Sequence, residues 1–305
     1  MRISKDDLKS DGLLVITAVI WGSAFSAQRS GMESIGPFAF NAVRFAVGAL
    51  SVLPILLVVK RRTRAAGPSG GPRPGLAKKL AYISVTGAVL FCGTSFQQMG
   101  LVTTTAGNSG FITCLYVILV PLVGFAFGRR SGPRIWAGAL IALTGLYILS
   151  IGSGFTIARG DLLELVGAFF WALHILVVGR FGGRMDGLEL AIGQYALCSL
   201  FSLFGALTLE SAPFAGTLAA AVPILYGGIF STGVAFTLQI YAQKTAHPAH
   251  ASIILSLESL FAAIGGIILL GEPLTPRLVA GGLLMLCGTI ISQLESTKPS
   301  QSANA

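Results

Sequence analysis

The stretch AVIWGSAFSAQ, residues 18–28, places a tryptophan inside a long apolar run and follows it at once with glycine and serine. Membrane proteins usually hold tryptophan at the boundary between water and lipid, where the ring is half wetted. Trp21 instead lies eight residues into a run that starts near residue 13, about 12 Å deep at the α-helical rise. An indole at that depth needs a partner for its N–H. It either packs between helices or lines a central cavity.

The composition makes lipid the solvent for much of the chain. Of its 305 residues, 53% are hydrophobic and 11% are charged, and the mean hydropathy is +0.79. Soluble domains carry roughly 25% charged residues, so a water-soluble core could not absorb this much apolar surface. The four cysteines lie inside apolar runs without a CxxC spacing, which favours packing over a disulfide framework or a metal site.

Ten segments are long and apolar enough to cross a bilayer, which takes about 20 residues in a helix. We expect these spans at residues 13–31, 37–59, 78–98, 104–127, 133–152, 161–180, 187–208, 217–241, 248–270 and 276–293. The segment between the second and third spans, residues 60–79, is rich in proline, glycine and positive charge and is predicted to be a flexible cytoplasmic loop. The tail, residues 294–305, is predicted to be disordered.

Positive charge gives the orientation of these spans. With the N-terminus inside, the inner segments hold 17 of the 21 lysines and arginines, and the outer loops hold three. Cytoplasmic loops of membrane proteins carry this excess of positive charge. We therefore expect a multi-pass protein of the cell membrane, most simply a bacterial inner membrane, with both termini in the cytoplasm. Because the positive charge follows this distribution, the +9 net charge does not indicate that the protein binds nucleic acid.

Two internal similarities indicate a repeat. DGLLVITAVIW (residues 11–21) matches DLLELVGAFFW (161–171), and WAGALIALTG (136–145) matches VAGGLLMLCG (279–288). Each half then holds five spans, and an odd number requires the second half to enter the membrane from the opposite side. The predicted fold is all-α and integral to the membrane, with ten transmembrane helices in two inverted five-helix repeats at 11–152 and 159–293. Asp11 and Asp161 are interpreted as helix N-caps.

Three motifs carry a family resemblance: IWGSAF in the first span, NAVRF in the second and GEPLTPRLVAGGLLMLCG at the last loop and span. They resemble the EamA-type branch of the drug/metabolite transporter superfamily, over about residues 11–293. Within that branch the chain looks most like YddG-type exporters of aromatic and other amino acids. The resemblance implies ten helices, cytoplasmic termini and export of small metabolites by alternating access.

Inverted repeats place a substrate site near the midplane, between the halves. Trp171 lies ten residues into its span and is the repeat counterpart of Trp21, so the two form the core of the candidate site. Polar and aromatic residues at helical spacing in other spans could share the cavity. We select Tyr82, Gln97, Asn108, Phe111, Tyr226 and Phe230. For each of these residues, packing between helices remains the alternative.

Ionisable residues inside a membrane are costly and are therefore weighed separately. Glu258 is ten residues into the ninth span and could carry a proton, anchor a substrate ammonium or only pack as a buried acid. His174, thirteen residues into the sixth span, completes the candidate set. Arg44 lies nearer the outer end of its span, where a long side chain can reach the interface or cap backbone carbonyls.

The leading function is a secondary exporter of amino acids, aromatic and other neutral ones, or of related small metabolites. A carrier of sugar-nucleotides or phosphorylated metabolites is the alternative, although such cargo calls for lysine or arginine deep in the cavity. Broad drug or metabolite efflux and a channel also remain open. The chain has no GxxxxGK[ST], HExxH or GxSxG motif, so neither ATP hydrolysis nor an enzyme activity is expected. No cofactor is predicted. The oligomeric state stays open, and a monomer is compatible with the sequence.

Overall fold

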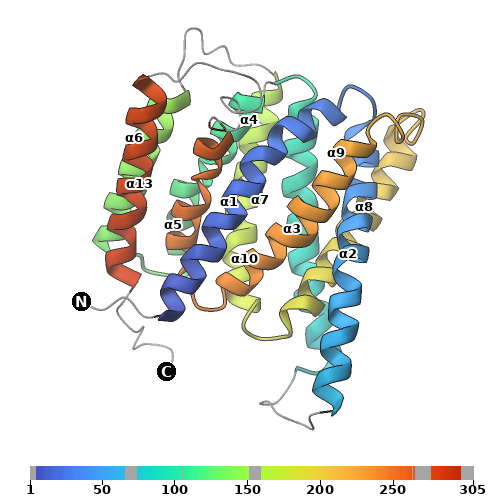
Figure 1. Cartoon of the computed structure of the whole chain (residues 1–305), viewed down its shortest axis with the longest axis horizontal. Coiled ribbons are helices and arrows are strands. Elements are labelled where there is room, and N and C mark those ends of the chain that lie inside the picture. Colours follow the sequence, from blue (N-terminus) through green and yellow to red (C-terminus); the bar gives the residue numbers. More distant parts are fainter. Residues whose placement is uncertain are drawn as a thin grey trace.

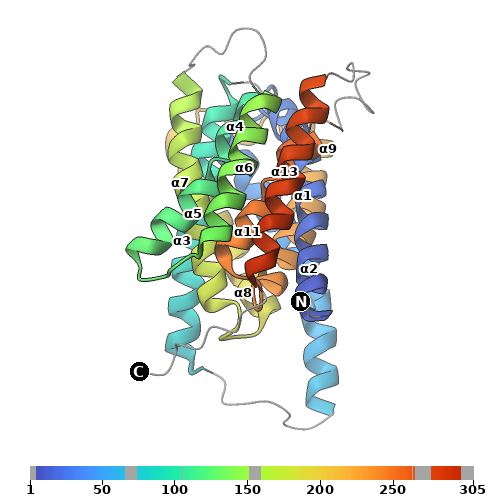
Figure 2. The same cartoon turned by 90° about the vertical axis from the view of Figure 1, so that its left-hand side faces the viewer.

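The computed structural model of the chain describes residues 5–65, 74–104, 106–150, 159–262, 264 and 276–296. In that part of the chain the structure is helical and contains no strand, and the helices form one bundle (Figures 1 and 2). The first half contains α1 (Lys5–Gly31), α2 (Pro37–Ala65), α3 (Leu76–Leu101), α4 (Ala106–Thr113), α5 (Tyr116–Ala126) and α6 (Pro133–Ser150). The second contains α7 (Arg159–Phe181), α8 (Gly187–Leu209), α9 (Ala221–Leu225), the π-helix η1 (Tyr226–Phe236), α10 (Thr237–Ala242), α11 (Pro248–Leu255) and α13 (Pro276–Ser296).

The expected membrane-spanning character is confirmed. Seven helical stretches of the described chain are long and apolar enough to cross a bilayer, and Pro133–Ile148 and Val279–Ser292 are shorter apolar helices. Large apolar side chains stay exposed on the outside of the bundle, among them Leu50 at 65%, Phe125 at 68% and Phe204 at 71% exposure. Because such a surface is unfavourable in water, the fold requires lipid around it.

The helices reach further than the expected spans. α2 continues to Ala65 and α3 begins at Leu76, so both enter the segment 60–79 that was expected to be a loop. Residues 66–73, at the centre of that loop, lie outside the described residues. α13 continues to Ser296, and the rest of the expected disordered tail lies outside them as well.

Three of the expected continuous helices are interrupted, which corrects the sequence-based expectation. The fourth span divides at Cys114 and Leu115 into α4 and α5, and the ninth turns at residues 256–257 after α11. Hydrogen bonds between residues three apart replace the α-helical pattern there, as in Leu115 N–H to the Ile112 carbonyl (3.1 Å) and Leu257 N–H to the Ile254 carbonyl (3.1 Å). The eighth span loosens into the π-helix η1. All three irregular segments therefore lie in the middle of the bundle's length.

The helix pairings show the inverted repeat. α6 packs along α13, α2 along α8 and α5 along α11, and each pair joins corresponding helices of the two halves. α3 packs on α7 and on α8, while its counterpart η1 packs on α1 and on α2. If the two halves are exchanged, the contact of α3 with α7 becomes that of η1 with α1, and the contact of α3 with α8 becomes that of η1 with α2. That is the behaviour of two copies related by a pseudo-two-fold axis.

Glycines in the matched segments 136–145 and 279–288 show the same symmetry at the level of single residues. A Cβ on Gly138 would lie 2.6 Å from the carbonyl oxygen of Gly288, and a Cβ on Gly145 would lie 2.6 Å from that of Gly281. In the sequence match, Gly138 corresponds to Gly281 and Gly145 to Gly288. The two contacts are therefore reciprocal, and the small residues let α6 and α13 approach with their backbones nearly touching.

Asp11 and Asp161 hold neighbouring helices together. α1 begins at Lys5, so Asp11 lies inside it and the N-cap interpretation of Asp11 is wrong. Its carboxylate lies 3.0 Å from His250 Nε2, and His250 Nδ1 lies 2.8 Å from Ser292 Oγ, which ties the starts of α1 and α11 to the end of α13. At the other end of the bundle, α7 begins at Arg159, so Asp161 lies inside its first turn and the N-cap interpretation of Asp161 is wrong as well. Asp161 accepts a hydrogen bond from Thr104.

Candidate functional site

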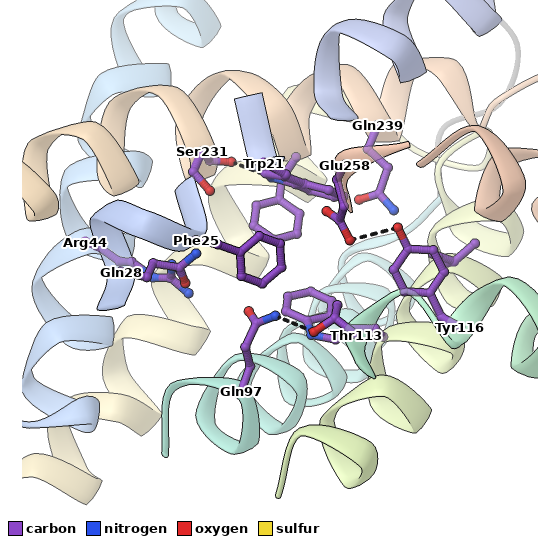
Figure 3. A pocket seen from close by; sticks show the side chains of 13 residues that line it. Trp21, Phe25, Gln28, Arg44, Gln97, Thr113, Tyr116, Ser231, Gln239 and Glu258 are labelled. Carbon is purple, nitrogen blue, oxygen red and sulfur yellow. Dashed lines mark hydrogen bonds between the residues drawn. The ribbon is translucent and has the colours of Figure 1, made fainter. Parts of the chain in front are cut away.

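A pocket lies between the two halves, at the depth of the helix interruptions. Its empty volume is about 460 Å³, which includes space open to the surroundings. Both halves line it, and Figure 3 shows their side chains converging on one space. The lining residues are Trp21, Phe25, Gln28, Arg44, Gln97, Thr113, Tyr116, Trp171, Ile175, Ser231, Phe236, Gln239 and Glu258.

Residues 18–28 of α1 form one wall. Trp21, Phe25 and Gln28 follow each other at helical spacing and therefore share a face. Gly22 is required behind them, because a Cβ there would lie 2.5 Å from the carbonyl oxygen of Glu258. Ser23 shares a hydrogen bond with the Tyr226 hydroxyl. Tryptophan, glycine and serine in a row thus face three different neighbours.

Aromatic rings from both halves meet on this wall. The Trp21 ring centroid lies 4.7 Å from that of Phe236, and Trp171 stacks on the same Phe236 at 5.8 Å and 19°. Trp21 donates its indole N–H to the Ser231 carbonyl at 3.2 Å, which provides the partner that its depth requires. Trp171 lines the pocket and is only 8% exposed, and its buried indole N–H has no partner among the described residues.

The two interrupted helices meet at the pocket. Tyr116, the first residue of α5, donates its hydroxyl to Glu258 Oε1 at 3.0 Å, just after the turn that follows α11. Cys114, in the other turn, lies 3.4 Å from the same carboxyl oxygen and 2.9 Å from Ser259 Oγ. Discontinuous helices at the midplane expose polar backbone and side chains where a transported solute can reach them.

Polar groups occupy the other side of Phe25. Arg44 Nη1 donates to Gln28 Oε1 at 2.6 Å, and Figure 3 shows this pair apart from Glu258. Gln97 Nε2 donates to Thr113 Oγ1 at 2.9 Å, and Thr113 in turn donates to Glu164 at 3.4 Å. Glu164 is fully buried and also accepts from Ser109 at 2.7 Å. It is a second buried carboxyl, and the sequence pattern did not single it out.

Four of the ten candidate residues line the pocket: Trp21, Gln97, Trp171 and Glu258. His174 stands behind its wall, bonded to Gln194 at 3.0 Å and edge-on to Trp171. Phe111 packs against the core nearby. Three candidates lie elsewhere: Tyr82 stacks on Phe181, and Tyr226 stacks on Phe230, which is half exposed. The side chain of Asn108 lies outside the described residues.

The remaining lining residues were missed for identifiable reasons. Phe25 and Gln28 share the helical face of Trp21 and could have been found from spacing alone. Ser231 and Phe236 are five residues apart, which is the spacing of a π-helix and not of the regular α-helix that was assumed for this span. Arg44 is 2% exposed and lines the pocket. Its side chain turns into the bundle and bonds to Gln28, so the expectation that it reaches the interface does not describe this structure.

Comparison with known proteins agrees with this geometry. The model of a family described as EamA-like transporter family matches residues 8–151 and again residues 158–294. A protein of Archaeoglobus fulgidus named "Uncharacterized transporter" is 34% identical over 289 residues, covering 94% of this chain and 86% of that protein. A protein of Streptantibioticus cattleyicolor named "Probable terminal-alkyne amino-acid exporter" is 27% identical over 290 residues, covering 91% of each.

A solved crystal structure shares the fold. It matches with a TM-score of 0.73 over 93% of this chain and 96% of that chain, at 20% sequence identity. At that identity the likeness concerns the arrangement of helices alone. It supports the bundle described above and carries no information on cargo.

Proposed function

The chain belongs to the EamA-like transporter family, and on that premise we propose that it is a secondary exporter of neutral amino acids, aromatic ones included, or of related small metabolites. It moves them across the cytoplasmic membrane by alternating access. The observation that carries the proposal is the aromatic pocket between the two halves, where Trp21, Trp171 and Phe236 meet. We infer that transport involves no covalent step, since the named relatives are transporters.

The pocket suits a small solute with an apolar body. Aromatic faces from α1, α7 and η1 attract apolar or cationic groups, while a few polar side chains fix orientation. Because each half supplies part of the wall, rocking one half against the other changes the side from which the pocket opens without dismantling it. The S. cattleyicolor protein named "Probable terminal-alkyne amino-acid exporter", similar along nearly its whole length, supports amino acids as cargo.

Phosphorylated cargo fits the pocket less well. Arg44 provides one cationic group among the lining residues, but Glu258 places a carboxyl in the same space. A phosphate monoester carries roughly two negative charges near neutral pH, which Arg44 alone would not balance. The Glu258 carboxyl adds no compensating positive charge. Sugar-nucleotides therefore remain the second candidate.

Counterflow in proteoliposomes tests the proposal. Vesicles loaded with an unlabelled amino acid should accumulate the labelled form transiently, with saturable rates, for at least one member of a panel that includes phenylalanine, tryptophan, leucine and threonine. A carrier gives this transient accumulation of the labelled amino acid, and a pore does not. Trp171→Ala should lower the exchange rate about tenfold or more, as expected for loss of a central buried aromatic contact.

The control is Phe204→Ala, which removes an aromatic side chain that is 71% exposed on the outside of the bundle. It should leave exchange near the wild-type rate. Absence of counterflow for every amino acid in the panel, together with counterflow of a phosphorylated sugar, would contradict the proposal.

A further inference from the structure

Arg44 is a buried cation without a charged partner among the described residues. It is 2% exposed and donates one hydrogen bond to the neutral amide of Gln28. Its guanidinium lies over the rings of Phe40 and Phe45, at 5.5 and 4.9 Å from their centroids. Its Nε has no hydrogen-bond partner in the described part of the chain. Burial of a charge is costly unless an opposite charge or several hydrogen bonds compensate it.

Glu258 is a buried acid without a basic partner among the described residues. It is 3% exposed and accepts from the Tyr116 hydroxyl and the Cys114 thiol. The ion pairs found in the described chain join Glu189 to two lysines and Asp11 to His250, and none includes Arg44 or Glu258. The pocket therefore contains one basic and one acidic side chain, and neither is paired with a charge of the described protein.

The two groups lie at different levels of α1. Glu258 packs on Gly22, where its carbonyl oxygen leaves no room for a Cβ. Arg44 is bonded to Gln28, six residues further along the same helix. Six residues correspond to about 9 Å of helix axis between the backbone contact of Glu258 and the residue that holds Arg44. Figure 3 shows Phe25 between them, so Arg44 and Glu258 face the pocket from opposite ends.

We propose that these two residues select a zwitterion, with the carboxylate of the cargo at Arg44 and its ammonium at Glu258. The inference rests on the proposed function and specifies its substrate class as free α-amino acids. In an α-amino acid the ammonium nitrogen lies about 2.5 Å from the carboxylate carbon. With a charge-assisted hydrogen bond of about 2.8 Å at each end, it bridges a gap of about 8–9 Å. A solute with only one of the two charges leaves a buried charge of the protein unpaired.

Gln239 supports this assignment at the Glu258 end. It lines the pocket, is 1% exposed, and neither atom of its carboxamide has a partner among the described residues. Figure 3 shows it on the same side of the pocket as Glu258 and Tyr116. Its carbonyl oxygen can accept a second hydrogen bond from an ammonium. The faces of Trp21 and Trp171 then accommodate the cargo side chain.

The test removes one charge at a time from the cargo and from the protein. Phenylalanine, phenylalaninamide and 3-phenylpropanoate compete for counterflow of labelled phenylalanine, and leucine, leucinamide and 4-methylpentanoate do so for labelled leucine. The wild type should prefer the zwitterion over either analogue about tenfold or more, because each analogue loses one charge-assisted contact. Arg44→Gln should reduce the preference over the amide to under about threefold and keep the preference over the deaminated acid. Glu258→Gln should do the reverse.

Controls separate charge recognition from folding. Arg61→Gln and Glu33→Gln remove one charge of each sign at exposed positions and should keep both preferences. If Arg44→Gln does not fold, Arg44→Lys, which keeps the charge, should keep the discrimination against the amide. Equal competition by all three compounds in the wild type, or an equal effect of each pocket variant on all three, would overturn the inference. Counterflow of amino acids would then still stand, whereas its absence in the wild type would contradict the proposed function itself.

Discussion

At the scale of single residues, position in the α1 helix decides what each side chain can do. Trp21 turns to the pocket and to the Ser231 carbonyl, and Gly22 turns to the backbone at Glu258. Ser23 turns to Tyr226. Because consecutive residues of a helix point about 100° apart, one short motif provides a ring and a hydrogen bond toward η1 and a close backbone contact at Glu258. Exchanging Trp21 with Gly22 would therefore break the contacts of both residues.

Gly22→Ala should destabilise the protein. The new Cβ would meet the Glu258 carbonyl oxygen at 2.5 Å and the Ala262 backbone nitrogen at 2.8 Å, neither of which can move as a side-chain end would. Overpacking of this kind costs about 1–3 kcal/mol. Thermal unfolding of the purified protein in detergent measures it. Gly12→Ala, in the same helix with nothing within 4 Å, is the control and should be neutral or stabilising. Equal unfolding temperatures for the two variants would refute the close contact.

At the scale of elements, the interruptions of the helices determine where the site lies. Residues flanking two helix turns, Tyr116 and Glu258, meet across the pocket, and the π-helix η1 contributes Ser231 and Phe236 from the third irregular segment. Sequence spacing placed Trp21 and Trp171 together, and both line the pocket. It failed at η1, because a wider turn changes which residues share a face. It also could not show that Tyr116 reaches Glu258, since that contact exists only once the two breaks are side by side.

The start of α2 is held by a residue from another helix. Glu210, which follows α8, accepts hydrogen bonds from the backbone N–H groups of Phe38 at 2.8 Å and Ala39 at 3.2 Å. A carboxylate at a helix N-terminus satisfies free donors and opposes the helix dipole. Gly36 leaves the space for it, since a Cβ there would lie 2.3 Å from the Glu210 carboxyl carbon.

Glu210→Ala should therefore cost about 0.5–2 kcal/mol of stability, the range for loss of a helix N-cap. Thermal unfolding in detergent reports the loss. Glu33→Ala, in the exposed connection before α2, removes the same charge without the cap and should leave the unfolding temperature unchanged. If both variants unfold at the wild-type temperature, Glu210 does not cap α2.

At the scale of the whole molecule, two inverted halves share one pocket. The starts of α1 and α11 and the end of α13 meet through His250 at one end of the bundle. This is the end that the distribution of positive charge assigns to the cytoplasm. Both chain termini should then be cytoplasmic.

Cysteine labelling with a membrane-impermeant reagent tests this orientation. Cysteines at Ser69 and Ser300, which lie outside the described residues, should react only from the cytoplasmic side. Cysteines at Thr103 and Ser211, both exposed, should react only from outside. Reaction of position 69 from outside would reverse the assignment. The four native cysteines must first be replaced, since Cys287 is exposed.

The most direct test of the central claim is access to the pocket itself. Ser231→Cys, in a transport-competent background without the native cysteines, places a thiol on the pocket wall, and Ser252→Cys places one at a buried position outside the pocket. We predict that an impermeant thiol reagent modifies position 231 from either side of the membrane. An excess of amino acid on one side should change the ratio of the modification rates from the two sides. The transported amino acid should also slow the reaction. Position 252 should stay unreactive. Reaction of position 231 from one side only under every condition, with no protection by any amino acid, would contradict alternating access through this pocket.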